Sequence, residues 1–158
     1  LLDSNVLIQA SQMHYGFDFC PGFWSWIKQE NASGKVYSVE KVSEELGRRQ
    51  DELSDWVWGH AEELFLGVDE RVFESMRTVA NAVQAVPRYT APARFEFLDK
   101  ADAFLIAHAH AYQDVVVTHE KAAPEGRKPK IPDVASMLGV KTISPFEMLR
   151  RERARFVL

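Results

Sequence analysis

The sequence has almost no cysteine and no long apolar run. Its one cysteine, Cys20, excludes an intramolecular disulfide and a cysteine-rich zinc site, which favours a reducing environment. No stretch of about 18 apolar residues is present, so a membrane-spanning helix is not expected, and no secretory signal sequence is recognisable. We therefore expect a cytoplasmic protein without a membrane association.

Strong charge of one sign is also absent, as are internal repeats and low-complexity tracts. The formal net charge of -4 argues against a protein that coats nucleic acid, although a local basic surface can lie beside an acidic site. The length of 158 residues and the 46% of hydrophobic residues suit one domain with a real core. We predict a single domain over residues 1–158.

Four short β-rich segments alternate with helical patterns. They occupy residues 1–2, 36–39, 115–118 and 140–143. The sequence starts with leucine instead of methionine, so we expect further residues upstream and a first strand that begins before position 1. Such alternation predicts the α/β class, with a parallel sheet between two layers of helices. We expect three layers (α/β/α) and four or five strands.

Apolar spacing indicates the helices. The clearest has an apolar stripe from Val72 to Val86, with Asp69 at its start and Pro87 at its end. One helix is predicted to begin directly after the first strand, and others lie at residues 22–31, 40–49, 51–66, 101–112, 132–138 and 145–153. Residues 87–92 and 121–130 are predicted loops. The tryptophans are interpreted as core residues of helices, with base stacking as the alternative: Trp24, Trp26, Trp56 and Trp58.

Acidic residues follow the predicted strands or open the helices next to them. The candidates for a functional site are Asp3, Glu45, Asp102, Glu120 and Asp133. Ligands of open α/β sheets collect outside the carboxyl ends of the strands, where these residues would converge. Clustered carboxylates raise one another's pKa unless a cation compensates them, and Mg²⁺ prefers oxygen ligands. The pattern therefore points to metal-assisted hydrolysis of a phosphodiester.

Each acid also has an ordinary structural interpretation. Asp3 can cap a helix, and Asp102 suits the first turn of a helix that Asp99 is expected to cap. Glu44 and Glu45 point about 100° apart, so only one can face inward. We choose Glu45, because it directly precedes Leu46.

Four segments together resemble the PIN domain of metal-dependent ribonucleases. They are LDSNVLI (2–8), VSEEL (42–46), DKADAFLIA (99–107) and VVTHE (116–120). Three more are similar to a bacterial PIN-like branch found beside regulatory genes and related to VapC-type toxin ribonucleases: YGFDFCPGFW (15–24), KIPD (130–133) and ARFVL (154–158). The order and spacing of the segments cover nearly the whole chain.

The resemblance implies roles for particular residues. Asp3, Glu45 and Asp102 would be the central metal-site acids. The fourth acid of the pattern is usually an Asp, where this sequence has Glu120, and Asp133 competes for that role. Thr118 would hold a water or orient a neighbour. Ser4 and Asn5 would tie the loop or a metal-bound water, or else act only as caps.

The resemblance also implies an activity and partners. We expect a Mg²⁺- or Mn²⁺-dependent endoribonuclease, the toxin of a bacterial toxin-antitoxin pair, which acts on RNA and binds an antitoxin protein; a homodimer is left open. One alternative is a weak or inactive PIN-like module that binds protein or RNA. Another is a metal-dependent phosphatase or a DNA nuclease that uses the same carboxylates.

Basic residues and one histidine lie close to the acidic motifs. His119 flanks Glu120 and is interpreted either as a phosphate contact or as a structural residue. Two basic groups would bind a nucleic-acid backbone or remain solvated, and the second would also suit an acidic antitoxin segment. The groups are Lys121, Arg127, Lys128 and Lys130, and Arg150, Arg151, Arg153 and Arg155.

Overall fold

A computed structural model describes residues 1–156 as a mixed α/β fold dominated by helices. The helices are α1 (Ser4–Gln9), the π-helix η1 (Ala10–His14), α2 (Pro21–Ala32), α3 (Glu40–Gly47), α4 (Glu52–Trp58), α5 (Ala61–Leu64), α6 (Glu70–Gln84), α7 (Ala91–Asp99), α8 (Ala101–Tyr112), α9 (Ile131–Met137) and α10 (Pro145–Arg151). The strands are β1 (Ser38–Val39), β2 (Phe65–Leu66), β3 (Val115–Val117) and β4 (Lys141–Ile143). The last two residues of the ARFVL segment, Val157 and Leu158, lie outside the described part.

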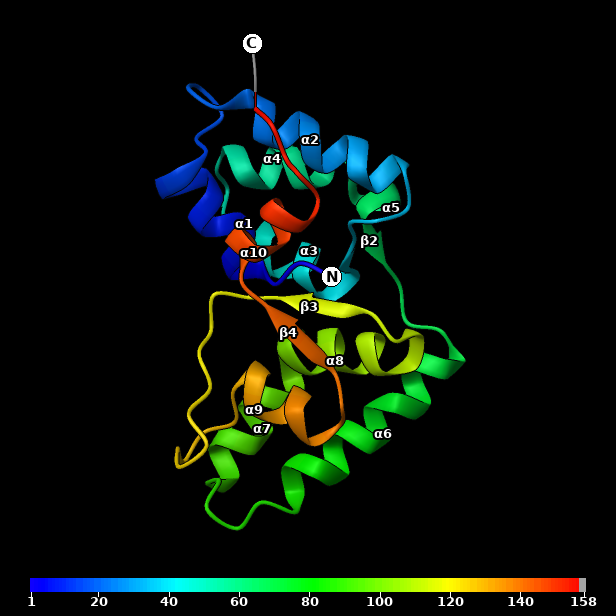
Figure 1. The fold of residues 1–158 in the computed structure, drawn as a ribbon. Helices are drawn as coiled ribbons and strands as arrows, with labels where there is room; N and C mark the ends of the chain where they lie inside the picture. Colours follow the sequence, from blue (N-terminus) through cyan, green and yellow to red (C-terminus); the bar gives the residue numbers. More distant parts are fainter. Residues whose placement is uncertain (157–158) are drawn as a thin grey trace.

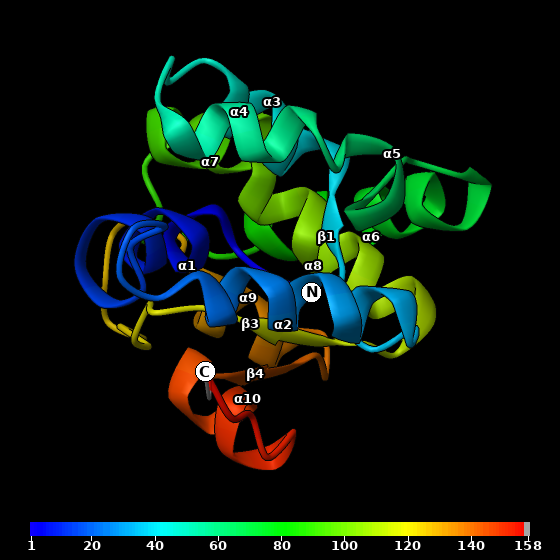
Figure 2. The same ribbon diagram turned by 90° about the horizontal axis from the view of Figure 1, so that it is seen from above.

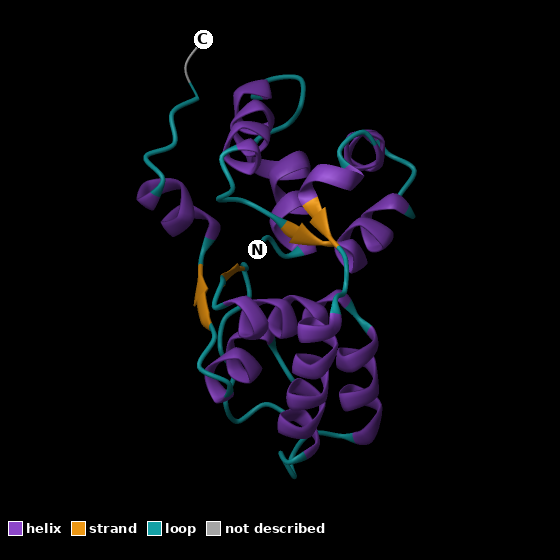
Figure 3. Cartoon of the chain, turned by 90° about the vertical axis from the view of Figure 1, so that its right-hand side faces the viewer, coloured by secondary structure: helices purple, strands orange, loops and turns teal. Residues whose placement is uncertain are grey.

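The strands form two small parallel sheets with the start of the chain between them. β1 pairs with β2, and β3 pairs with β4. The Leu2 N–H donates to the Tyr37 carbonyl (2.8 Å) beside β1, and Leu2 forms a parallel bridge with Val117 of β3. Figure 3 shows the N-terminus between the two pairs of strands. The strands run in parallel within each pair, and residue 2 runs parallel to β3, so adjoining strands of each group end at the same edge.

Helix α8 occupies the centre of the molecule. It contacts β1 and β3 as well as α6, α7 and α9, and it lies between the strands and the lower helices in Figure 1. Its sequence is rich in alanine and buried on several sides, which permits close packing by many neighbours. Figure 2 shows α3, α4 and α7 on one side of α8, with α2 and α10 on the other.

The best-supported sequence predictions concern α6 and the last two strands. The Asp69 carboxylate accepts a hydrogen bond from the Val72 N–H (2.9 Å) and caps α6, which ends three residues before Pro87. Val72, Val79 and Val83 are fully buried, as their spacing predicts. The predicted strands at 115–118 and 140–143 are confirmed as β3 and β4, each to within one residue.

Other predictions were too long or missed an element. The predicted helix at 51–66 breaks at Gly59 into α4 and α5 and ends in β2, because its last two residues pair with β1. The helix α7 was missed, although Thr90 caps it through the Ala93 N–H (3.3 Å) and Pro92 lies in its first turn. Trp58 was expected in the core and is instead 60% exposed.

The predicted N-cap of α8 was also wrong. Asp99 is the last residue of α7, and Lys100 takes the N-cap position of α8 without a side-chain capping bond. The expected α/β class is confirmed, but the paired strands within residues 1–156 form two two-stranded sheets and one bridge. No helix of the described residues is long and apolar enough to cross a membrane.

Candidate metal centre at the carboxyl edge of the strands

Asp3 is buried where the N-terminal segment turns into α1. Its side chain is 1% exposed, and its two oxygens accept hydrogen bonds from Thr118 Oγ1 (2.9 Å) and Ser4 Oγ (3.3 Å). Burial raises the pKa of Asp3 to about 6, the Thr118 hydrogen bond opposes the rise, and the charge of Glu120 adds to it. A carboxyl at this position is therefore held in place but costly to ionise.

Asp102 lies in the first turn of α8 and faces the same edge. Burial raises its pKa to about 7, and the charges of Asp3, Glu120 and Glu45, in decreasing order, raise it further. Four of the five acids predicted from the sequence therefore lie near one another, since the charges of Asp3, Glu120 and Glu45 all act on Asp102.

Glu45 connects α3 to the start of α8. Its Oε1 accepts a hydrogen bond from the Ala101 N–H (3.0 Å), so it supplies the cap that the local sequence of α8 lacks. Glu44 instead is exposed and pairs with Lys41 (3.3 Å). Of the two neighbouring glutamates, Glu45 is thus the one directed toward Asp102.

Thr118 and Glu120 follow the last residue of β3 and lie at the same edge as Asp3. Glu120 Oε2 accepts a hydrogen bond from the Ile131 N–H (2.8 Å) at the start of α9. Thr118 is buried, and its hydroxyl donates to Asp3 while it accepts from the Glu120 N–H (3.0 Å). One threonine therefore fixes the positions of two acids from distant parts of the chain.

Asp133 has a different environment. Both of its oxygens accept from the Ala123 N–H (3.1 and 3.0 Å), which ties the 121–130 loop to the start of α9. Asp133 is not among the groups whose charge acts on Asp3 or Asp102. The structure therefore brings together Asp3, Glu45, Asp102 and Glu120, and it places Asp133 in the support of the loop.

The negative charge of these four acids has little compensation from side chains. Lys100 is the one cation of the described residues that lowers the pKa of Asp102, and its ammonium pairs with Glu96 (2.5 Å). Carboxylate oxygens that repel one another are the ligands that Mg²⁺ and Mn²⁺ prefer, so the donor set fits such an ion. Within residues 1–156, however, no three acidic, histidine or cysteine side chains already stand in a geometry that would hold a metal.

Repulsion between the acids and direct ligation of an ion require different distances. Charges act on each other over several ångströms, whereas ligation needs oxygens within about 2.0–2.2 Å of one ion. Glu45 and Glu120 each use one oxygen to bind a backbone N–H, so they would have to rotate or ligate through water. Within residues 1–156 the four acids therefore form an acidic cluster, and not an assembled coordination shell.

Two aromatic neighbours of His119 were not predicted from the sequence. The rings of His14 and Phe146 lie 6.2 and 6.1 Å from the His119 ring, between centroids. The three residues come from η1, α10 and the end of β3. No local pattern links positions so far apart, so the sequence offered no signal for this group.

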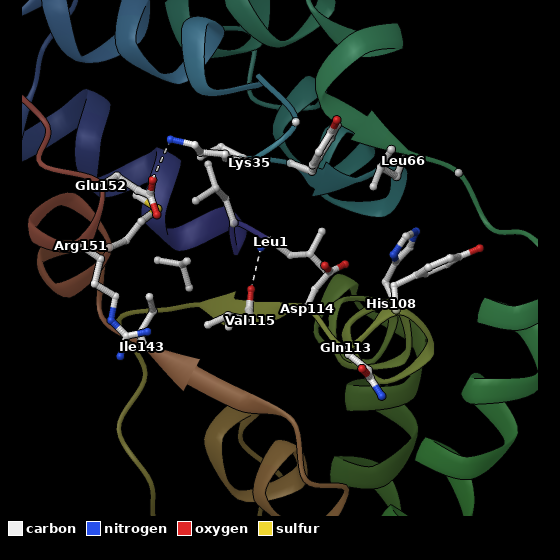
Figure 4. Close-up of a pocket in the computed structure, with 18 of the residues that line it drawn as sticks. Leu1, Lys35, Leu66, His108, Gln113, Asp114, Val115, Ile143, Arg151 and Glu152 are labelled. Carbon is white, nitrogen blue, oxygen red and sulfur yellow. Dashed lines mark hydrogen bonds and ion pairs between the residues drawn. The ribbon is translucent and has the colours of Figure 1, made fainter. Parts of the chain in front are cut away.

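A cavity opens at the amino ends of β1 and β3 (Figure 4), and the last residues of β2, β3 and β4 also line it. It has a volume of about 720 Å³, and its lining includes Leu1, Val115 and Asp114. At its rim Lys35 pairs with Glu152 (3.2 Å), as the dashed line in Figure 4 shows. The cavity contains none of the clustered acids and does not coincide with the candidate metal centre.

Comparisons with known proteins give a family without an assigned activity. A family model described as a domain of unknown function, DUF4411, matches residues 1–156. The chain therefore belongs to the DUF4411 family. No curated protein and no solved structure matches it.

Proposed function

We propose that the protein is a metal-dependent endoribonuclease with a PIN-like fold. The main support is the charge arrangement, in which Asp3, Glu45 and Glu120 all raise the pKa of Asp102 while Lys100 alone lowers it. A divalent cation is the simplest partner for such a cluster at neutral pH. The resemblance of the four acidic segments to the PIN domain supplies the reaction class.

The arrangement of the strands supports the PIN-like part of the proposal. Residues 1–3 hydrogen-bond to Tyr37 beside β1 and to Val117 of β3, so the parallel segments follow the order β2, β1, residues 1–3, β3, β4. We propose that they act as one central sheet with helices on both faces. Its carboxyl edge would then be the place where a substrate meets the acids.

The side chains suggest how the site would work. Asp3, Asp102, Glu45 and Glu120 would hold Mg²⁺ or Mn²⁺, which when bound would polarise the phosphoryl oxygen and activate water. Thr118 keeps the Asp3 carboxylate oriented, because its hydroxyl donates to Asp3 Oδ2. Below a pH of about 7 and without a cation, Asp102 would hold a proton, which it would release when the site is filled.

RNA as the substrate, the toxin role and an antitoxin partner rest on the resemblance alone. Exposed basic residues of the 121–130 loop, which starts directly after Glu120, are compatible with a nucleic-acid substrate: Lys121, Arg127 and Lys128. A metal-dependent phosphatase or DNA nuclease would use the same four acids, so substrate assays must separate these possibilities.

A second candidate function is a PIN-like binding module without catalysis. The specific observation in its favour is that Glu45 and Glu120 each hold the first N–H of a helix, α8 and α9. Both acids would then be structural caps. The two functions differ in whether removal of a single charge abolishes a metal-dependent reaction.

The test is an RNA-cleavage assay with Mn²⁺ on the wild type and on Asp3→Asn and Glu45→Gln. We expect Asp3→Asn to lower the rate by about a thousandfold or more, since a charged metal ligand would be lost. Glu44→Gln is the matched control, because Glu44 neighbours Glu45 but pairs with Lys41 at the surface. Its rate should stay within about twofold of the wild type.

Three outcomes separate the candidates. Equal rates for wild type and Asp3→Asn would reject the nuclease and leave the binding module. Cleavage of single-stranded DNA in preference to RNA, or hydrolysis of a small phosphomonoester alone, would reject the RNA assignment. Loss of all cleavage on replacing Mn²⁺ with EDTA is the result expected of the proposed enzyme.

A further inference from the structure

Three aromatic rings pack together around His119, and two of them, His14 and His119, are half-buried. This aromatic triad consists of His14, His119 and Phe146, with ring centroids 5.7 to 6.2 Å apart. Phe146 is 41% exposed. His119 follows Thr118, which donates to Asp3, and precedes Glu120. The triad therefore borders the acids directly along the chain.

Phe146 also lines a groove between α10 and the C-terminal segment. The groove has a volume of about 410 Å³, and we call it the arginine groove because its lining is Phe146, Leu149, Arg150, Arg153, Ala154, Arg155 and Phe156. The C-terminal segment turns back from α10 towards α2 (Figure 1), and Phe156 packs on Tyr15 and Phe23. The groove thus continues from the aromatic triad along one side of the molecule.

The arginines of this groove have no acidic partner. Arg150, Arg153 and Arg155 are all exposed, and within residues 1–156 none of them forms an ion pair. Arg151, outside the groove, instead pairs with Glu147 (2.5 Å). Three unpaired guanidinium groups that line one groove with the exposed Phe146 ring match an anionic, aromatic ligand.

We propose that the aromatic triad and the arginine groove hold a single-stranded segment of the RNA on one side of the acidic cluster. An unpaired base would lie against Phe146, and the phosphates that follow it would lie along Arg150, Arg153 and Arg155. The inference rests on the proposed function, which sets a phosphodiester at the acids. Stacking platforms next to cationic tracks are the usual means of binding single strands.

An acidic protein segment is the rival occupant. It would gain from the arginines but would have little use for the exposed Phe146 ring, which packs on His119 beside Glu120 in the sequence. The exposed Phe146 ring and the place of His119 between Thr118 and Glu120 therefore favour the nucleic acid.

Binding is best measured by fluorescence anisotropy with labelled oligoadenylate RNA and Ca²⁺ in place of Mn²⁺, to prevent cleavage. Phe146→Ala should weaken binding by about tenfold, the size expected for one lost base stack. Phe73→Ala is the matched control, because Phe73 is also an exposed helical phenylalanine, 64% exposed on α6. It should bind as the wild type does.

The arginines are tested by the salt dependence of the same binding. Each phosphate contact to a single strand contributes about 0.7 to the slope of log K against log salt. The double variant Arg150→Gln/Arg155→Gln should therefore lower the slope by about 1.4. Arg77→Gln/Lys141→Gln removes two exposed charges from α6 and β4 and should leave the slope unchanged.

The outcomes distinguish this inference from the proposed function. Groove-dependent RNA binding without Mn²⁺-dependent cleavage supports the inference and rejects the nuclease. Cleavage with unaltered binding by Phe146→Ala and by the arginine variant overturns the inference and leaves the nuclease standing. Tight binding of a labelled oligoglutamate peptide that RNA does not displace would also overturn it, in favour of an acidic protein partner.

Discussion

The two edges of the parallel strands differ in how their charges are balanced. At the carboxyl edge, burial and neighbouring carboxylates raise the pKa of Asp102 to about 7. At the amino edge, Lys35 pairs with both Glu30 and Glu152 (3.2 Å each) beside the cavity of about 720 Å³. The ion pairs of Lys35 balance charge at the rim of the cavity, whereas the acidic edge carries an excess of negative charge. Charge balance, and not volume, therefore marks the candidate site.

The largest expected difference between the two edges is in the free energy of unfolding of the metal-free protein. A carboxyl whose pKa is raised on folding binds its proton more tightly in the folded state, so ionisation destabilises the fold. The metal-free protein should therefore lose stability as the pH rises from about 4 to about 7, the interval between the ordinary and the folded pKa of Asp102. Asp102→Asn should raise the free energy of unfolding at pH 8 by about 3 kcal/mol, and change it little at pH 4.

Urea denaturation in EDTA at the two pH values measures this change. Asp114→Asn is the control, because Asp114 is a half-buried carboxylate at the amino edge that lines the large cavity. We expect it to alter the free energy of unfolding by less than about 1 kcal/mol at either pH. Destabilisation by Asp102→Asn at pH 8 would mean that the carboxylate is already compensated, and the contrast between the edges would disappear.

A smaller change in stability is expected when Thr118, which binds two groups at the acidic edge, is replaced. Thr118→Val keeps the shape of the side chain but removes the donor to Asp3 and the acceptor for the Glu120 N–H. We expect the free energy of unfolding to fall by about 1–2 kcal/mol, because buried polar groups lose their partners. Differential scanning calorimetry of this variant beside Thr142→Val, on the neighbouring strand β4, provides the measurement.

The two threonines differ in their contacts. Thr142 is half-buried and makes no side-chain hydrogen bond within residues 1–156, so its replacement should cost less than about 0.5 kcal/mol. Equal losses for the two variants would indicate that Thr118 contributes packing alone.

Local signals explain which parts of the fold were predictable. The helix α6 has its cap, its apolar stripe and its stop in the sequence, so it was found nearly to the residue. The helix α7 carries an equally local signal, Thr90 before Pro92, which was read as a loop because of its proline. The strand β2 could not be found locally, because only its pairing with β1 distinguishes Phe65 and Leu66 from the helical residues before them.

The residues of the candidate site could be predicted from the sequence, but the hydrogen bonds and contacts between them could not. The acids could be nominated because each stands at a strand end or a helix start. That Glu45 caps α8 through the Ala101 N–H depends on residues 56 positions apart, and the sequence suggested Asp99 instead. The meeting of His14, His119 and Phe146 is likewise a product of tertiary packing. Long-range contacts of this kind leave no periodic trace in the sequence.

Calorimetric titration of the metal-free protein with Mn²⁺ tests the central claim most directly. At pH 6.5, in two buffers with different heats of ionisation, the account predicts binding with the release of about one proton, since Asp102 is still protonated there. Asp102→Asn should bind Mn²⁺ much more weakly and release fewer protons, while Asp114→Asn should behave as the wild type. Absence of Mn²⁺ binding by the wild type, or binding that Asp102→Asn leaves unchanged, would contradict a metal centre at the acidic edge.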